Sequence, residues 1–136
     1  MKTLSLLFCI FSLSFSLNSL ASDQCTTQAK LKTRKAQLKT LETNRESIDT
    51  RLELFDNALN NHRFDIAKTY IRDIKKTIDV TLNFIKTKQA VYNNLYASCE
   101  VNEQKKMEKQ LEKLQEELNA FEVLNNYVIE FSSRLN

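Results

Sequence analysis

Two heptad patterns on either side of a short polar segment constrain the fold of this chain more than any other feature. The segment is residues 57–63, NALNNHR, and apolar residues recur before and after it at alternating steps of three and four. Such steps are typical of helices that pack along a seam. The first seam is Leu31, Arg34, Leu38, Leu41, Arg45, Ile48, Leu52, Phe55 and Leu59. The second seam is Phe64, Ala67, Ile71, Ile74, Ile78, Thr81, Ile85, Lys88, Tyr92 and Leu95.

The two seams pair in a single register when the chain folds back at residues 57–63. The 136 residues include neither glycine nor proline, on which tight β-turns depend, and this favours long helices joined by short turns. Asn60 and Asn61 are predicted to take the left-handed conformation that ends the first helix, or to cap the second. Asp65 suits the first turn of that second helix. We therefore expect helices at about 23–59 and 63–98.

A third helix is predicted at about 102–135, with Asn102 as its N-cap. Its seam is out of phase with the second helix, which indicates a turn near residues 99–102. A β-hairpin that turns at Asn125-Asn126 is the alternative for the C-terminal piece, although an isolated hairpin is marginal. The expected fold is all-α: an elongated three-helix bundle, with the third helix packed along a long antiparallel, coiled-coil-like hairpin. The third seam is Met107, Leu111, Leu114, Leu118 and Phe121.

The N-terminal segment has the pattern of a secretory signal peptide. Lys2 is the only charge before Asp23, residues 4–17 are apolar and rich in serine, and Ser19 and Ala21 are small residues at a cleavage site. We expect residues 1–21 to be removed and residues 22–136 to form a single helical domain. The protein is then exported, either periplasmic or secreted. A transmembrane anchor is the alternative.

Removal of the leader leaves two cysteines, Cys25 and Cys99, at equal distances before and after His62. An even cysteine count in an oxidising compartment predicts one disulfide bond. The register of the hairpin also brings Cys99 opposite Gln24, next to Cys25. Two separate buried thiols are the alternative.

The sequence contains no motif that predicts catalysis, a cofactor or a metal site. It has no nucleophile–base pair and no phosphate-binding loop, and the carboxylates of Glu116 and Glu117 point in different directions on a helix. His62 is the only histidine and lies in a polar turn. A net charge of +3 is too balanced to indicate a nucleic-acid partner. We expect a protein that is not an enzyme.

The C-terminal part of the third helix is apolar over a wide face, which suggests partner binding. The leading hypothesis is an exported interaction protein: an accessory subunit, an inhibitor or a chaperone-like binder. The face suits a protein partner or a homodimer, and the alternative is that it belongs to the core. The candidate partner-binding residues are Phe121, Leu124, Tyr127 and Phe131.

A second hypothesis is binding to an anionic membrane surface or polymer through a basic helical face. Arg34 and Lys88 oppose each other in the predicted seam, and two facing cations destabilise the packing there unless an anion neutralises them. Glu116 or Glu117 of the third helix is the internal alternative, and extension of both side chains to water is another. The candidate anion-binding residues are Lys30, Arg34, Lys35 and Lys88.

Overall fold

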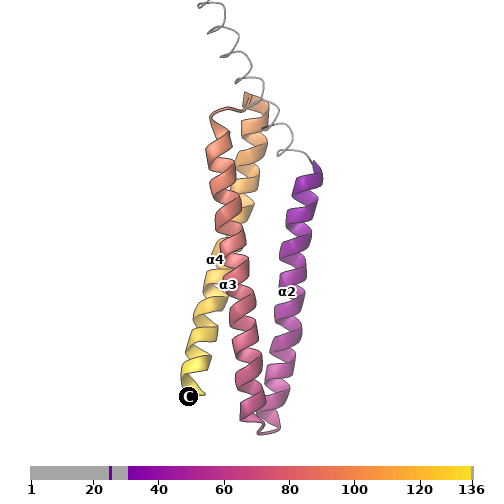
Figure 1. The fold of residues 1–136 in the computed structure, drawn as a ribbon, viewed down its shortest axis with the longest axis vertical. Coiled ribbons are helices and arrows are strands. Elements are labelled where there is room, and N and C mark those ends of the chain that lie inside the picture. The colour runs from indigo at the N-terminus through magenta and orange to yellow at the C-terminus, as the bar shows by residue number, and fades with distance from the viewer. Residues whose placement is uncertain (1–24, 26–30, 136) are drawn as a thin grey trace, which may run out of the picture.

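The computed structural model describes Cys25 and residues 31–135, with the backbone alone for residues 31–35. The described chain forms three long helices, α2 (Leu31–Asn60), α3 (Phe64–Tyr96) and α4 (Val101–Arg134). Helix α3 runs antiparallel to α2 and α4, so the molecule is an elongated up-down-up bundle (Figure 1). The predicted all-α fold is confirmed. The predicted signal peptide and the expected helix start at residue 23 lie outside the described residues.

Helix α4 differs from the sequence prediction at its first residue and from the β-hairpin alternative in its C-terminal part. It starts at Val101 with Glu100 as the N-cap residue, not at Asn102, and no side chain caps it. The helix passes through Asn125 and Asn126 without a break, so the alternative of a β-hairpin there is wrong. Phe121 and Val128, on either side of the two asparagines, are both buried on one helical face, whereas an isolated two-stranded hairpin is marginally stable.

The turn between α2 and α3 takes its left-handed residue later than predicted. His62 has φ 56°, the only positive φ in the described chain. The backbone N–H of His62 donates to Leu59 O at 3.0 Å, and that of Arg63 donates to Ala58 O at 2.8 Å. These two bonds define a Schellman motif with His62 at the C′ position. The prediction for Asn60 and Asn61 is wrong because Asn61 N still donates to Asn57 O, and thus continues the helix.

Helix α3 lies at the centre of the core. Its seam residues Ala67, Ile74, Ile78, Thr81 and Ile85 are completely buried. Full burial of one such isoleucine contributes roughly 1.5–3 kcal/mol. Helices α2 and α4 each pack closely along α3 and much less closely on each other. Three residues of the predicted seam are not fully buried: Phe64 is half exposed at the start of α3, and Lys88 and Leu95 are half-buried.

The predicted seam of α2 is correct at five of the seven positions whose side chains the structure describes. Leu41, Ile48 and Phe55 are buried and Leu52 and Leu59 are half-buried against the core, but Leu38 and Arg45 are exposed. Gln37 and Asn44 face α3 in their place: the Tyr92 hydroxyl donates to Gln37 Oε1 at 3.0 Å, and Asn44 Nδ2 donates to Thr81 Oγ1 at 2.8 Å. The reason is that α2 has two neighbours. Leu38 and Arg45 turn toward α4, so a single seam cannot describe the helix.

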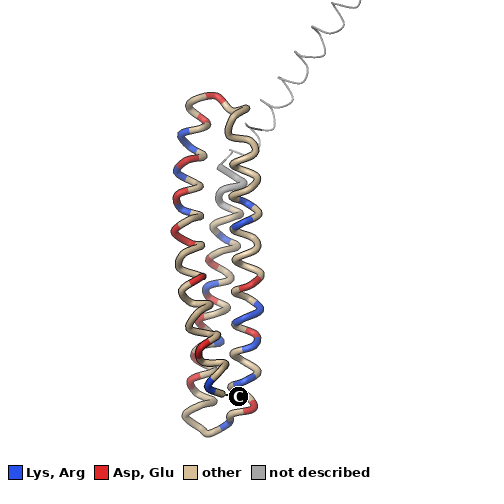
Figure 2. The backbone as a smooth tube through the Cα atoms, turned by 90° about the vertical axis from the view of Figure 1, so that its left-hand side faces the viewer, with Lys and Arg blue, Asp and Glu red and all other residues tan. Residues whose placement is uncertain are grey.

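The density of charged residues changes along helix α4. Figure 2 shows that charges of both signs crowd the N-terminal half of α4 and become sparse toward its C-terminal end. Among the side chains that the structure describes, two ion pairs connect α4 to the hairpin, Arg45–Glu117 to α2 and Lys86–Glu122 to α3. Both pairs place the base on the hairpin and the acid on α4. Exposed pairs of this kind contribute about 0.2–1 kcal/mol each, so they orient α4 more than they hold it.

Candidate functional site

The structure divides the four predicted partner-binding residues between the core and the surface. Phe121 is 2% exposed and belongs to the core, and Leu124 is half-buried. Tyr127 is 58% exposed and Phe131 is 43% exposed. Phe121 therefore follows the alternative that the face belongs to the core, in agreement with its place in the predicted third seam, whereas Tyr127 and Phe131 lie at the surface. Phe121 lies on the side of α4 toward the bundle interior, together with Leu114 and Val128, because these three positions share one helical face.

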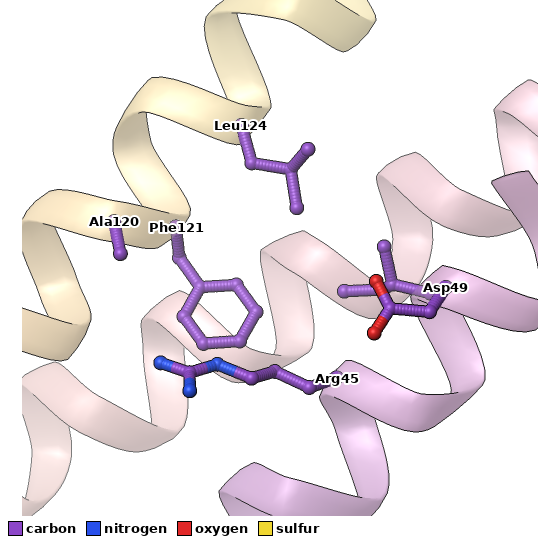
Figure 3. Close-up of a pocket in the computed structure, with 6 residues that line it drawn as sticks. Arg45, Asp49, Ala120, Phe121 and Leu124 are labelled. Atoms are coloured by element: carbon purple, nitrogen blue, oxygen red, sulfur yellow. The ribbon is translucent and has the colours of Figure 1, made fainter.

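Aromatic contacts join the C-terminal half of α4 to α2. The guanidinium of Arg45 lies 5.9 Å from the centre of the Phe121 ring (Figure 3). The same group pairs with Glu117. Farther along, the rings of Phe55 and Phe131 meet edge to face, with their centres 6.0 Å apart. These contacts fix the side of α4 that faces α2. Tyr127 lies on that side as well, since it is three residues from Leu124 and four from Phe131.

Two cavities open between α2 and α4, where the two backbones lie apart. One, of about 140 Å³, is lined by Arg45, Ile48, Asp49, Ala120, Phe121 and Leu124 (Figure 3). The other, of about 240 Å³, lies between residues 37–41 and residues 110–117. The Arg45–Glu117 pair stands between them. We call this line of cavities, with the adjoining side chains of Tyr127 and Phe131, the α2–α4 groove.

Carboxylates predominate along the groove. Asp49 lines the smaller cavity and points toward it (Figure 3), and Glu116 lines the larger one. Asp56 is exposed two turns beyond Asp49 on the same side of α2. Between Lys113 and Arg134 the sequence of α4 contains no basic residue. Two basic side chains line the cavities: Arg45, which is engaged by Glu117, and Lys113, which lines the larger cavity with Glu116. The carboxylates of Asp49, Asp56 and Glu116 outnumber Lys113, so the rims of the groove are acidic on balance.

The predicted anion-binding residues are not assembled in the part of the chain that the structure describes. The side chains of Lys30, Arg34 and Lys35 lie outside that part. The ammonium of Lys88 is 5.6 Å from the centre of the Phe84 ring on its own helix. Glu117, one of the two acids expected to answer Lys88, pairs with Arg45 instead. Binding to an anionic surface stays a prediction.

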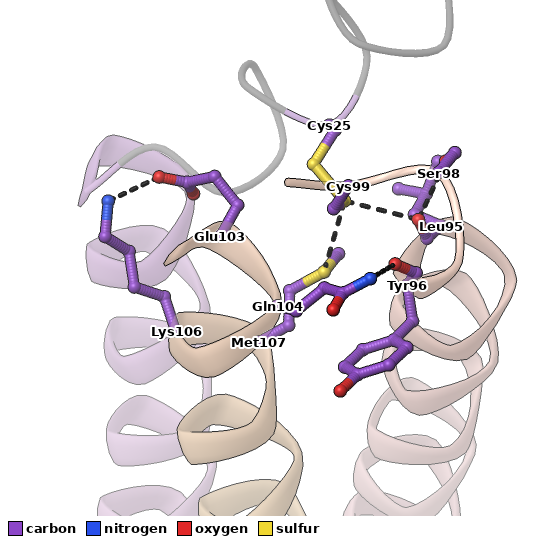
Figure 4. The surroundings of a disulfide bond; sticks show 9 residues. All are labelled: Cys25, Leu95, Tyr96, Ser98, Cys99, Glu103, Gln104, Lys106 and Met107. Atoms are coloured by element: carbon purple, nitrogen blue, oxygen red, sulfur yellow. Dashed lines mark hydrogen bonds and ion pairs between the residues drawn. A yellow bond between two sulfur atoms is a disulfide. The ribbon is translucent and has the colours of Figure 1, made fainter. Parts of the chain in front are cut away.

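Cys25 and Cys99 meet at the end of the bundle opposite the His62 turn (Figure 4). Their sulfur atoms are bonded and their Cα atoms are 5.6 Å apart, within the range that a disulfide requires. The sulfur of Cys99 lies 3.5 Å from the sulfur of Met107, and Gln104 Nε2 donates to Tyr96 O at 3.0 Å. These contacts hold the crosslinked end against the start of α4.

Other features of the described residues concern a metal site, a shifted pKa and a membrane-spanning helix. Among them, no three His, Cys, Asp or Glu residues cluster in a way that would hold a metal ion. His62 is exposed in the turn, with its ring 6.1 Å from that of Phe64. A hydrogen bond to Glu108 raises the pKa of Tyr96, with smaller contributions from burial and from the charge of Glu108. Within the described chain, no helix is long and apolar enough to cross a membrane.

The chain matches no protein-family model, and neither a curated protein nor a solved structure is significantly similar to it. The functional argument therefore depends on the groove. Sequence reasoning placed Arg45 in the hairpin seam and did not consider Asp49. The available signal was the arginine itself, because a charged residue at a seam position often marks the edge of a buried strip.

Proposed function

We propose that this chain is an exported, non-enzymatic helical protein that binds another protein through the C-terminal half of α4. The observation that carries the proposal is the concentration of exposed apolar side chains on this part of the helix. Isolated apolar residues are normal on a protein surface, whereas a contiguous group is typical of an interaction site. The group is Val123, Tyr127 and Phe131, which recur every four residues on one side of α4 and are each 43–58% exposed.

The hairpin and its crosslink provide a rigid support for this surface. One face of α3 is buried from Ala67 to Tyr92, and the Cys25–Cys99 bond would hold the far end together. Disulfides persist in oxidising compartments, so the bond and the leader-like segment at residues 1–21 support the same proposal of export. A slim bundle of this kind suits an accessory subunit, an inhibitor or a chaperone-like binder.

The test of partner binding is photo-crosslinking in the native host from position 127. A photoreactive residue at position 80 is the matched control, because Val80 on α3 is 59% exposed and lies outside the apolar group. We expect a discrete crosslinked protein from position 127 that is absent from position 80. Crosslinks from position 127 to the same chain alone would refute the proposal.

The test of export is the mass of the protein recovered from its host without reduction. We expect a chain that begins at Ser22 and contains no free thiol. A product that retains residues 1–21, or that has two free thiols, would contradict export and the crosslink respectively.

A further inference from the structure

The α2–α4 groove combines an apolar floor with acidic rims, and we propose that it binds a basic amphipathic helix of the partner. This inference rests on the proposed function and adds the chemistry of the partner. A helix that lies in such a groove presents apolar residues at i, i+3 or i+4, and i+7 to the floor, and its flanks meet the rims. Lysine or arginine on those flanks would pair with the rim carboxylates.

The apolar part of the groove has the dimensions of a helix anchor. Its smaller cavity has a volume of about 140 Å³, and a cavity of about 150 Å³ lined by apolar side chains accommodates benzene. One leucine or phenylalanine side chain therefore fits against Phe121 and Leu124. Tyr127 and Phe131 follow at the next two turns of α4 and would receive the next apolar residues of the partner.

The charges of the groove select a basic partner. Asp49 and Asp56 on one rim and Glu116 on the other form no ion pair with any described residue. They outnumber Lys113, the basic side chain that lines the cavities besides Arg45. Opposite charges across an interface favour the encounter and the register of binding more than they add to affinity. We therefore expect the rims to contribute selectivity, which salt weakens, and the apolar floor to contribute most of the affinity.

The same charges disfavour a second copy of the chain in the groove. A two-fold dimer places one surface patch against itself. The rim carboxylates of Asp49, Asp56 and Glu116 would then face the identical carboxylates of the other copy. Like charges at an interface oppose association. A partner with its own basic helix avoids this repulsion.

The experiment uses a synthetic peptide of about 18 residues, long enough to form a helix on binding. It has leucine at the apolar positions, lysine on the flanks and one tryptophan on the apolar face. Because the chain contains no tryptophan, the peptide alone provides the tryptophan fluorescence. A peptide with glutamate in place of lysine is the control for charge. Titration with the mature protein at about 50 mM and about 500 mM salt separates the electrostatic contribution.

We expect the lysine peptide to bind with a blue shift of its fluorescence, and at least tenfold more tightly than the glutamate peptide at low salt. The double variant Asp49→Asn/Asp56→Asn should weaken binding about fivefold at low salt and little at high salt. The matched control is Asp65→Asn/Asp73→Asn on α3, where both acids are exposed. This control variant should bind as the unchanged protein does.

The apolar floor has its own matched pair of variants. Tyr127→Ser should weaken binding at least fivefold at both salt concentrations, and Val80→Ser should not change it. Both residues are mostly exposed, so both variants should keep the circular dichroism and the melting temperature of the unchanged protein.

Three results would overturn the inference. The first is equal binding of the two peptides, and the second is a loss that the α3 control variants share. The third is a concentration-dependent dimer that Tyr127→Ser dissociates, because the groove would then be filled by a second copy. A discrete partner crosslinked from position 127, together with equal binding of the two peptides, would refute the basic helix and leave the proposed function standing.

Discussion

Truncation of Phe121 tests the division of α4 into a core side and a surface side. The Phe121 ring is 2% exposed, packs against the core and lies beneath the guanidinium of Arg45. We expect Phe121→Ala to lower the free energy of unfolding by about 3–4 kcal/mol, within the range for buried aromatic residues. The lower part of that range applies because Phe121 already borders an open cavity of about 140 Å³. Water can enter the enlarged space, so the cost of an empty cavity is reduced.

The matched control is Val123→Ala, two residues farther along the same helix. Val123 is 56% exposed, and its truncation should change the free energy of unfolding by no more than about 0.5 kcal/mol. Alanine has a higher helix propensity than valine, so any small effect of this substitution should stabilise the protein. The comparison thus separates burial from helix formation.

The assay is urea denaturation followed by circular dichroism at 222 nm, with a thermal melt in parallel. A loss of about 3–4 kcal/mol corresponds to a melting temperature lower by about 12–16 °C for a domain of this size. A loss below about 1 kcal/mol for Phe121→Ala would refute the assignment of this residue to the core. Equal losses for both variants would refute the division of α4 into two sides.

Three further predictions concern the turn, the crosslink and a tyrosine. His62→Gly should raise the free energy of unfolding by about 0.5–1 kcal/mol, since glycine takes a positive φ without strain; Asn61→Gly, at a position without positive φ, should lower it by a similar amount in the same urea assay. Reduction of the disulfide should lower the melting temperature without unfolding the protein, because closing a loop with a sequence separation of 74 contributes at most about 4.5 kcal/mol; an unchanged melt would contradict the crosslink. Glu108→Ala should lower the pKa of Tyr96 toward 10.0, because the variant removes the acceptor that raises it; in the unchanged protein Tyr96 stays protonated to higher pH than a free tyrosine, and NMR titration of labelled tyrosine rings measures both values.

The sequence predicted burial well where a helix has one continuous apolar seam in the core. The heptad positions of α3 from Ala67 to Ile85 are buried as expected, because α3 is central and both of its sides are covered. Periodicity suffices in this case, since a buried seam is apolar whatever lies opposite. The direction of α4 was left open by the sequence. The bonds from Gln89 to Gln115 and from Tyr96 to Glu108 show that α4 runs antiparallel to α3.

Sequence reasoning was wrong at positions of a helix that lie between two neighbouring helices. Leu38 is apolar and exposed, whereas Gln37 is polar and buried, and the bond from Tyr92 to Gln37 explains the exchange. Such a bond joins residues far apart in the chain, so no local pattern reveals it. The same reasoning failed at the turn. His62 takes the left-handed position that asparagine would suit, because the length of α2 decides which residue follows its last turn.

The sequence by itself determined that this chain forms long helices, that the helices fold back at residues 57–63, and that the two seams of the hairpin pair in antiparallel. These features follow from helical periodicity and from the lack of glycine and proline. Only the tertiary structure decided which side of α4 is core and which is surface. Phe121 and Tyr127 are both aromatic residues on one helix, yet one is buried and the other exposed. The position of α2 makes that difference, since it covers Phe121 and leaves the groove open beside Tyr127.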